Sequence, residues 1–305
     1  MGERIVIACP PPARCQQTAP GRVSARPAVA NLPPRALLGN KLALFSAPGP
    51  LNRVLGPPIS LPEIDMLEIQ NLSKHFGPLK AVDGISLQVR RGEVLGFLGP
   101  NGAGKSTTMK MATGFLTPTG GTARICGHDI QTDAIAAKRA FGYLPEGAPA
   151  YPDMTPASFL EFIAGIRGLT GERKSARIAE VVKLVHIEGV LHQRIETLSK
   201  GFKRRVGLAQ AILHDPEVLI LDEPTDGLDP NQKHEVRALI QNMARSKAIV
   251  LSTHILEEVE AVCTRAIIIA KGRILFDGTP SDLAAQGPLD EVFRRITKGE
   301  SAALS

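Results

Sequence analysis

The sequence lacks any hydrophobic run that approaches the roughly 20 residues of a membrane-spanning helix. It has only four cysteines, and none of them stands in a C-x-x-C pair or a similar metal-binding spacing. The apolar stretch before Cys9 is about half the minimum length of a signal-peptide core, which disfavours a lipoprotein leader. We therefore expect a soluble body with reduced, cytosolic thiols.

Composition divides the 305 residues into two unequal parts. Residues 1–65 hold 12 of the 24 prolines, with seven basic and three acidic residues, and show no sustained period of 2 or 3.6. We expect this segment to be disordered. An alternating strand pattern begins abruptly at Met66, so the extension is either a misassigned start, which we favour, or a genuine basic linker. The remainder is nearly neutral, which disfavours a nucleic acid partner.

From Met66 onward, short apolar strands alternate with helical patterns, which predicts a parallel or mixed sheet with crossover helices. No strand pattern occurs between residues 151 and 213, where the periodicity is helical. A short amphipathic helix is predicted at residues 289–296. The predicted strands are residues 93–98, 218–221, 248–251, 266–269 and 273–276.

A glycine-rich segment, residues 99–107, follows one of these strands and precedes a helical pattern. It matches G-x-x-x-x-G-K-[ST], in which glycines let backbone N–H groups surround phosphate oxygens at the start of a helix. Lys105 would neutralise the β- and γ-phosphates, and Ser106 would bind Mg²⁺. The predicted nucleotide-binding residues of this loop are Gly99, Pro100, Asn101, Gly102, Ala103, Gly104, Lys105, Ser106 and Thr107.

A second apolar strand, residues 217–224, ends in two adjacent carboxylates. Asp222 is placed to hold Mg²⁺ through water, and Glu223 could act as the base that polarises an attacking water molecule. A strand that simply leaves the core could also end in acids, but the phosphate loop favours the catalytic interpretation. The pair predicts an NTPase without naming its kind.

The segment LSKGFKRR, residues 198–205, resembles the signature of ABC ATPases, usually LSGGQ, through Leu198, Ser199 and Gly201. It precedes the acidic strand by about one helix, as in that family. The resemblance covers the chain from Met66 onward, and implies an α/β, RecA-like P-loop NTPase core. It also implies a small antiparallel β subdomain and a helical subdomain at about residues 146–215.

Three further positions are similar to family positions. His254 matches the switch histidine that contacts the γ-phosphate, and Asp229 in GLDP matches the loop that communicates across a dimer. Phe76 matches the aromatic residue that stacks on adenine. One position departs: Glu146 stands where the family usually has a glutamine that binds Mg²⁺ or water and couples to the transporter. The YLPE, LSKG and GLDPNQ segments are similar to exporter-type subunits of gliding-motility and copper-processing systems, so we interpret Glu146 as a branch marker.

The resemblance implies an ATPase that uses ATP and Mg²⁺ and works as a dimer, most simply a homodimer, with nucleotide closed between the phosphate loop of one subunit and the signature of the other. Its partner would be a separate membrane permease, which would hold it at the cytoplasmic face of the membrane. Export is favoured because importer subunits often carry a regulatory domain after the cassette. An importer subunit or a non-transport ABC ATPase remains the alternative, whereas a small-molecule kinase would leave the signature and His254 unexplained.

Overall fold

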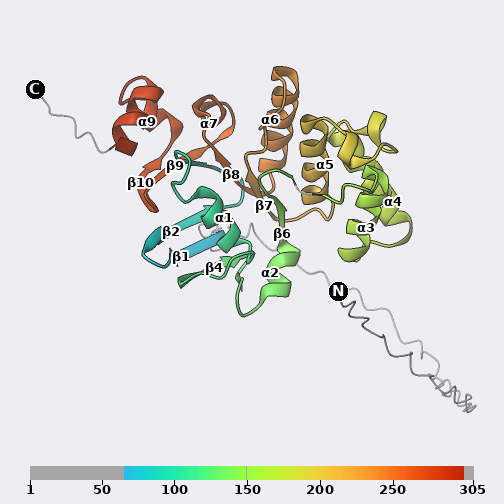
Figure 1. Ribbon diagram of the computed structural model, residues 1–305, viewed down its shortest axis with the longest axis horizontal. Coiled ribbons are helices and arrows are strands. Elements are labelled where there is room, and N and C mark those ends of the chain that lie inside the picture. Colours follow the sequence, from blue (N-terminus) through green and yellow to red (C-terminus); the bar gives the residue numbers. More distant parts are fainter. Residues whose placement is uncertain (1–64, 149, 299–305) are drawn as a thin grey trace, which may run out of the picture. The chain divides into compact units, whose positions relative to one another are not determined.

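Two β-sheets organise the part of the chain that this computed structural model describes, which is residues 65–148 and 150–298 (Figure 1). The predicted disordered extension falls outside these residues, except that Asp65 begins the first strand. Within the described ranges, no helix is long and apolar enough to cross a membrane.

The smaller sheet has four strands in the order β2-β1-β4-β5, and all neighbouring pairs are antiparallel. Leu67 and Ile69, the residues that gave the alternating pattern, are buried in it. This is the antiparallel subdomain that the family resemblance implied. Its strands are β1 (Asp65–Phe76), β2 (Leu79–Arg90), β4 (Gly120–Ile125) and β5 (His128–Asp129).

The larger sheet has six strands in the order β10-β9-β3-β8-β7-β6, parallel except for the antiparallel edge strand β10. The five strands predicted from the sequence are all present. They are β3 (Val94–Leu98), β7 (Val218–Asp222), β8 (Ala248–Thr253), β9 (Arg265–Ala270) and β10 (Arg273–Gly278). The sixth, β6 (Phe141–Leu144), escaped prediction because helix α2 (Ala134–Ala140) runs directly into it with no turn residue between them.

Helices fill the stretch between residues 151 and 213, as predicted, and the last helix is also where the periodicity placed it. Helix α1 (Lys105–Ala112) follows β3, and α6 (Pro230–Ala244) connects β7 to β8. The other helices are α3 (Pro156–Ile166), α4 (Gly171–Leu184), α5 (Lys200–Ile212), α7 (Leu256–Val262), α8 (Pro280–Ala284) and α9 (Leu289–Lys298), with short 3-10 turns at Glu188–Val190 and Ile195–Thr197.

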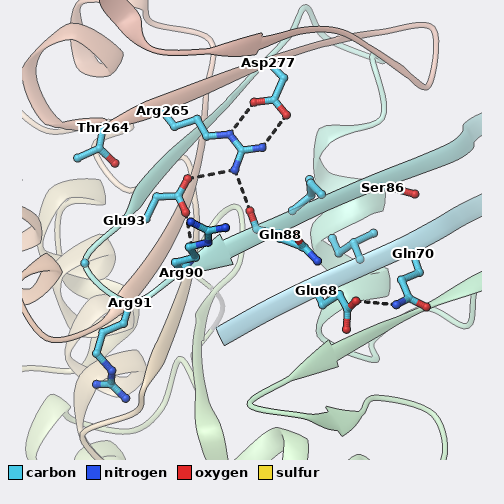
Figure 2. Close-up of a pocket in the computed structure, with 13 residues that line it drawn as sticks. Glu68, Gln70, Ser86, Gln88, Arg90, Arg91, Glu93, Thr264, Arg265 and Asp277 are labelled. Atoms are coloured by element: carbon cyan, nitrogen blue, oxygen red, sulfur yellow. Dashed lines mark hydrogen bonds and ion pairs between the residues drawn. The ribbon is translucent and has the colours of Figure 1, made fainter. Parts of the chain in front are cut away.

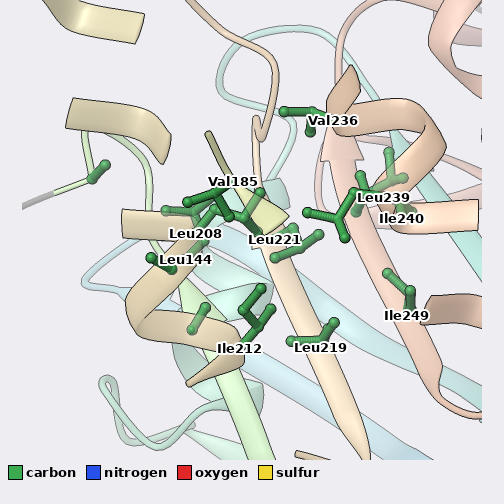
Figure 3. Close-up of a cluster of buried hydrophobic side chains, with 14 of the residues drawn as sticks. Leu144, Val185, Leu208, Ile212, Leu219, Leu221, Val236, Leu239, Ile240 and Ile249 are labelled. Carbon is green, nitrogen blue, oxygen red and sulfur yellow. The ribbon is translucent and has the colours of Figure 1, made fainter. Parts of the chain in front are cut away.

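The five parallel strands of the larger sheet are buried on both faces, which is why they read as continuous apolar runs. Along β7, Leu219 and Leu221 point to one side, where they pack with residues of helices α4, α5 and α6 (Figure 3). Val218 and Ile220 point to the other side, where they join the residues of α1 and the antiparallel sheet. This alternation fixes the side on which each residue at the end of β7 emerges.

Strand β6 and helix α5 approach so closely that only a glycine fits between them. A Cβ built on Gly142 would lie 2.0 Å from the carbonyl oxygen of Ala211, which is backbone and cannot move aside cheaply. We expect Gly142→Ala to lower the free energy of unfolding by about 1–3 kcal/mol, measured by urea denaturation. Gly165→Ala is the matched control: this helical glycine has nothing within 4 Å, so the change should raise stability by about 0.5–1 kcal/mol. Equal stability of the two variants would contradict the close packing.

Candidate nucleotide site

The phosphate loop joins β3 to α1, and two close backbone contacts set its shape. Gly102 and Gly104 have positive φ values of 78° and 111°. A Cβ on Gly99 would lie 2.4 Å from the carbonyl oxygen of Ile269, and one on Gly104 would lie 2.6 Å from that of Ala81. No side chain caps the start of α1, so its first N–H groups are free to bind an anion. A loop of this shape at the start of a helix could hold phosphate oxygens.

The Lys105 side chain is buried, with 7% of its surface exposed. Its amine donates to the carbonyl oxygens of Gly99 at 2.5 Å and Pro100 at 3.3 Å. Burial lowers the pKa of Lys105, and the negative charges of Glu223, Asp222 and Glu146 oppose that shift. The fold therefore brings all three predicted acidic residues within electrostatic reach of the predicted phosphate-binding amine.

Asp222 ends strand β7 and is fully buried. It pairs in register with Ser252 of β8, whose hydroxyl donates a short hydrogen bond to Asp222 Oδ1. The other oxygen, Oδ2, has no hydrogen-bond partner among the described residues. A buried carboxylate oxygen in this state fits a cation or a cation-bound water molecule.

Glu223 and His254 are in direct contact, a pairing that the sequence did not reveal. His254 Nδ1 lies 2.9 Å from Glu223 Oε1 and 2.8 Å from Oε2. Glu223 has a φ of 56°, unusual for a residue with a side chain, and its N–H donates to the carbonyl oxygen of Ser252 at 3.1 Å. Such a conformation is retained only where the surroundings impose it, and it directs the carboxylate toward His254.

A buried carboxylate, Glu258, connects the two loops that carry this pair, and sequence reasoning missed it. Glu258 Oε1 accepts a short hydrogen bond from the hydroxyl of Thr225, two residues after Glu223. Its Oε2 accepts from the hydroxyl of Thr253, directly before His254, at 2.8 Å. The only sequence signal was an acid on the inward face of a short helix.

The signature segment begins helix α5. Ser199 is its N-cap and accepts a hydrogen bond from the N–H of Phe202 at 3.3 Å. Gly201 packs against α6, because a Cβ there would lie 2.8 Å from Gln232 Oε1. Asp229 caps α6 and shares a capping box with the same Gln232. The hydrogen bonds described for Ser199 stay within its own helix, so the structure joins Ser199, Gly201 and Asp229 to one another and not to the phosphate loop.

The two remaining predicted residues lie at the border of the site. Phe76 is half exposed at the end of the β1–β2 hairpin, with the amine of Lys74 5.3 Å from its ring centre. The hairpin reaches the phosphate loop through the contact between Ala81 and Gly104. Glu146 is exposed in the turn after β6. This turn is held by Arg204, a buried residue of α5 that sequence reasoning missed and that donates to the carbonyl oxygen of Pro145 at 3.1 Å.

A cleft of about 880 Å³ lies elsewhere, between the antiparallel sheet and strands β9 and β10 (Figure 2). Three of its charged side chains bind one another. Arg265 binds both oxygens of Asp277 at 2.6 Å and also contacts Glu93 at 3.1 Å. Because these partners are already engaged, the cleft has less to offer a phosphate than the loop around Lys105.

Comparisons with known proteins agree with this geometry. The family model described as ABC transporter matches residues 82–226. The Nod factor export ATP-binding protein I of Paraburkholderia xenovorans is 39% identical over 220 residues, which cover 72% of each chain. The chain belongs to the family of ABC transporter ATP-binding proteins. It is an ATPase of this family, as the sequence predicted, and its predicted fold class is confirmed.

Two further members place the chain within the ABC family. The probable multidrug ABC transporter ATP-binding protein YbhF of Escherichia coli is 35% identical over 243 residues, 79% of this chain but only 42% of that protein. A solved ATP-binding subunit of an ABC transporter is 31% identical with a TM-score of 0.70, and the match covers 76% of this chain and 99% of that one. The match therefore spans nearly the whole of that solved chain.

We expect Lys105→Met to abolish most of the stabilisation that ATP gives the protein. A hydrogen bond to a charged group contributes about 1.5–3 kcal/mol, so ATP affinity should fall by at least about tenfold and the ATP-induced rise in melting temperature should shrink. Without ATP the melting temperature of Lys105→Met should stay close to that of the wild type, because the substitution removes a buried charged amine whose desolvation is costly. Lys110→Met, an exposed lysine of the same helix, is the control for thermal-shift measurements. An unchanged ATP-induced shift in Lys105→Met would contradict the assignment.

Proposed function

We propose that this ABC ATPase is the Mg-ATP-hydrolysing subunit of an exporter, in which two copies close over nucleotide and drive a separate membrane permease. The observation that carries the proposal is the Glu223–His254 contact, formed at the edge of the sheet where Lys105 and Asp222 also lie. Export is supported by relatives whose names include Nod factor export and probable multidrug transport.

The proposed nucleotide contacts begin at the phosphate loop. The loop N–H groups and the Lys105 amine bind the phosphates, and Phe76 stacks on the adenine. No cluster of three or more His, Cys, Asp or Glu residues within the described ranges could hold a metal alone. Mg²⁺ would therefore be shared, with Ser106 and Asp222 on the protein side, Glu146 beside them, and phosphate oxygens completing the shell. When bound, the ion would neutralise charge that develops on the phosphates.

In the proposed hydrolysis, Glu223 takes a proton from the water molecule that attacks the γ-phosphate. His254 holds the Glu223 carboxylate in position, and His254 also contacts the γ-phosphate. The remaining donors come from the other subunit. Ser199 and the backbone of Gly201 stand at the start of α5, where helix N–H groups favour an anion. Asp229 is packed beside them through Gln232, and it would couple the two nucleotide sites of the dimer.

We expect Glu223→Gln to bind Mg-ATP with near-normal affinity and to hydrolyse it at least about 100-fold more slowly, because a positioned general base contributes about 10²- to 10⁴-fold. Phosphate release measures turnover, and size-exclusion chromatography with ATP should reveal a trapped dimer. Glu257→Gln, an exposed acid of α7, is the matched control and should keep wild-type turnover. Near-normal phosphate release by Glu223→Gln would overturn the assignment of the base.

The permease would dock on the helical segment between Glu146 and the signature. Phe162 and Ile166 lie one turn apart on α3 with 44% and 64% of their surfaces exposed. Beside them, Glu161 lines a groove of about 420 Å³ between α3 and α4 whose lining includes Ile178 and Leu191. Exposed apolar side chains at helical spacing next to such a groove favour a protein partner.

Ile166→Asp should abolish co-purification with the permease from membranes and leave the ATPase activity of the isolated subunit unchanged. A charge buried at an apolar interface without a partner weakens binding strongly. Leu275→Asp tests specificity, because this residue is 47% exposed on the opposite edge strand β10. Loss of the permease in both variants, or in neither, would argue against docking through α3.

A further inference from the structure

Several buried polar atoms lack a hydrogen-bond partner among the described residues, and two of them lie on neighbouring strands at the site: the hydroxyl of Tyr143 and Oδ2 of Asp222. Tyr143 is 7% exposed and Asp222 is fully buried. Each such atom costs about 1–3 kcal/mol if nothing satisfies it. One is a donor and the other an acceptor, so they are chemically complementary.

The sheet places these two side chains on the same face of neighbouring strands. Strand β6 runs parallel to β7 with Tyr143 opposite Ile220, and Asp222 follows Ile220 by two residues. Because side chains alternate along a strand, Tyr143, Ile220 and Asp222 share one face, and Tyr143 and Ile220 lie in the same buried cluster. Because strands lie about 4.8 Å apart and parallel strands rise about 3.3 Å per residue, this offset separates the two Cα atoms by about 8 Å, within reach of an aromatic side chain.

The hydroxyl of Tyr143 is kept in its protonated form. Burial raises the pKa of Tyr143 far above its ordinary value, and the negative charges of Asp222 and Glu146 raise it further. The group therefore remains a hydrogen-bond donor that faces carboxylates. The neighbouring strand on the other side already has such a donor, because Ser252 of β8 binds Asp222 Oδ1.

We propose that Tyr143 is a positioning residue for Asp222: its hydroxyl donates through one shared water molecule to Oδ2, the oxygen that Ser252 leaves free. Asp222 would then be held from both flanking strands in an orientation suited to binding Mg²⁺. The inference rests on the proposed role of Asp222 in Mg²⁺ binding. Groups that orient a metal ligand in this way change metal affinity by about 10- to 100-fold when removed.

The first test is Tyr143→Phe, which removes only the hydroxyl. We expect the Mg²⁺ concentration for half-maximal ATPase activity to rise about tenfold. The melting temperature and the affinity for a fluorescent ATP analogue in EDTA should change little, which separates positioning from a general structural effect. Tyr151→Phe is the matched control, since Tyr151 is exposed and is the only other tyrosine in the sequence. A wild-type Mg²⁺ requirement in Tyr143→Phe would overturn the proposal.

The second test keeps Tyr143 intact and does not depend on activity. The sequence has no tryptophan, so in Tyr151→Phe the tyrosine emission comes from Tyr143 alone. Adding Mg²⁺ to the ATP-bound protein should change this emission, and Asp222→Asn should remove the change. If the emission does not change on addition of Mg²⁺ while the wild-type protein hydrolyses ATP, the role of Tyr143 is refuted and the proposed function still stands. A wild-type protein that neither binds nor hydrolyses Mg-ATP would refute both.

Discussion

The parallel register of β3, β8 and β7 is the constraint on which the site depends. Leu98 pairs with Thr253, and Asp222 pairs with Ser252, so the three strands end at the same edge of the sheet. The phosphate loop begins directly after β3, Asp222 is the last residue of β7 with Glu223 directly after it, and His254 directly follows β8. Residues separated by more than 100 positions in the sequence therefore meet because their strands are aligned, and a shift by one residue would move Asp222 to the opposite face.

Burial of charge prepares this edge for an anionic ligand. Lys105 and Arg204 are both buried, and burial lowers the pKa of each. Glu223, Asp222 and Glu146 oppose the shift for Lys105, and Asp226 together with the same three carboxylates opposes it for Arg204. Charges held in this way need little reorganisation when the ligand arrives. Glu258 also limits reorganisation of the site, since its two oxygens hold the loops of Glu223 and His254 in one arrangement.

Residues whose function follows from local spacing were predictable, and residues whose function follows from contact were not. The phosphate loop and the acidic strand end could be recognised because each lies within nine consecutive residues beside a strand. Arg204, Glu258 and the hydrogen bond from Ser252 could not, because their partners are about 5 to 60 residues away and local periodicity carries no information on such pairs. Strand β6 was missed for a different reason, the absence of any turn residue before it.

The charge balance of the proposed site explains why one subunit would bind nucleotide incompletely. Asp222, Glu223 and Glu146 outnumber the cations that face them, Lys105 and Arg204, and the phosphates of ATP would add more negative charge. When bound, Mg²⁺ would offset part of this excess at Asp222. The start of α5 from a second subunit would offset more, since the N–H groups at the start of a helix favour an anion. Nucleotide would thus hold two subunits together. Loss of the γ-phosphate would remove the negative charge that the start of α5 from the second subunit binds.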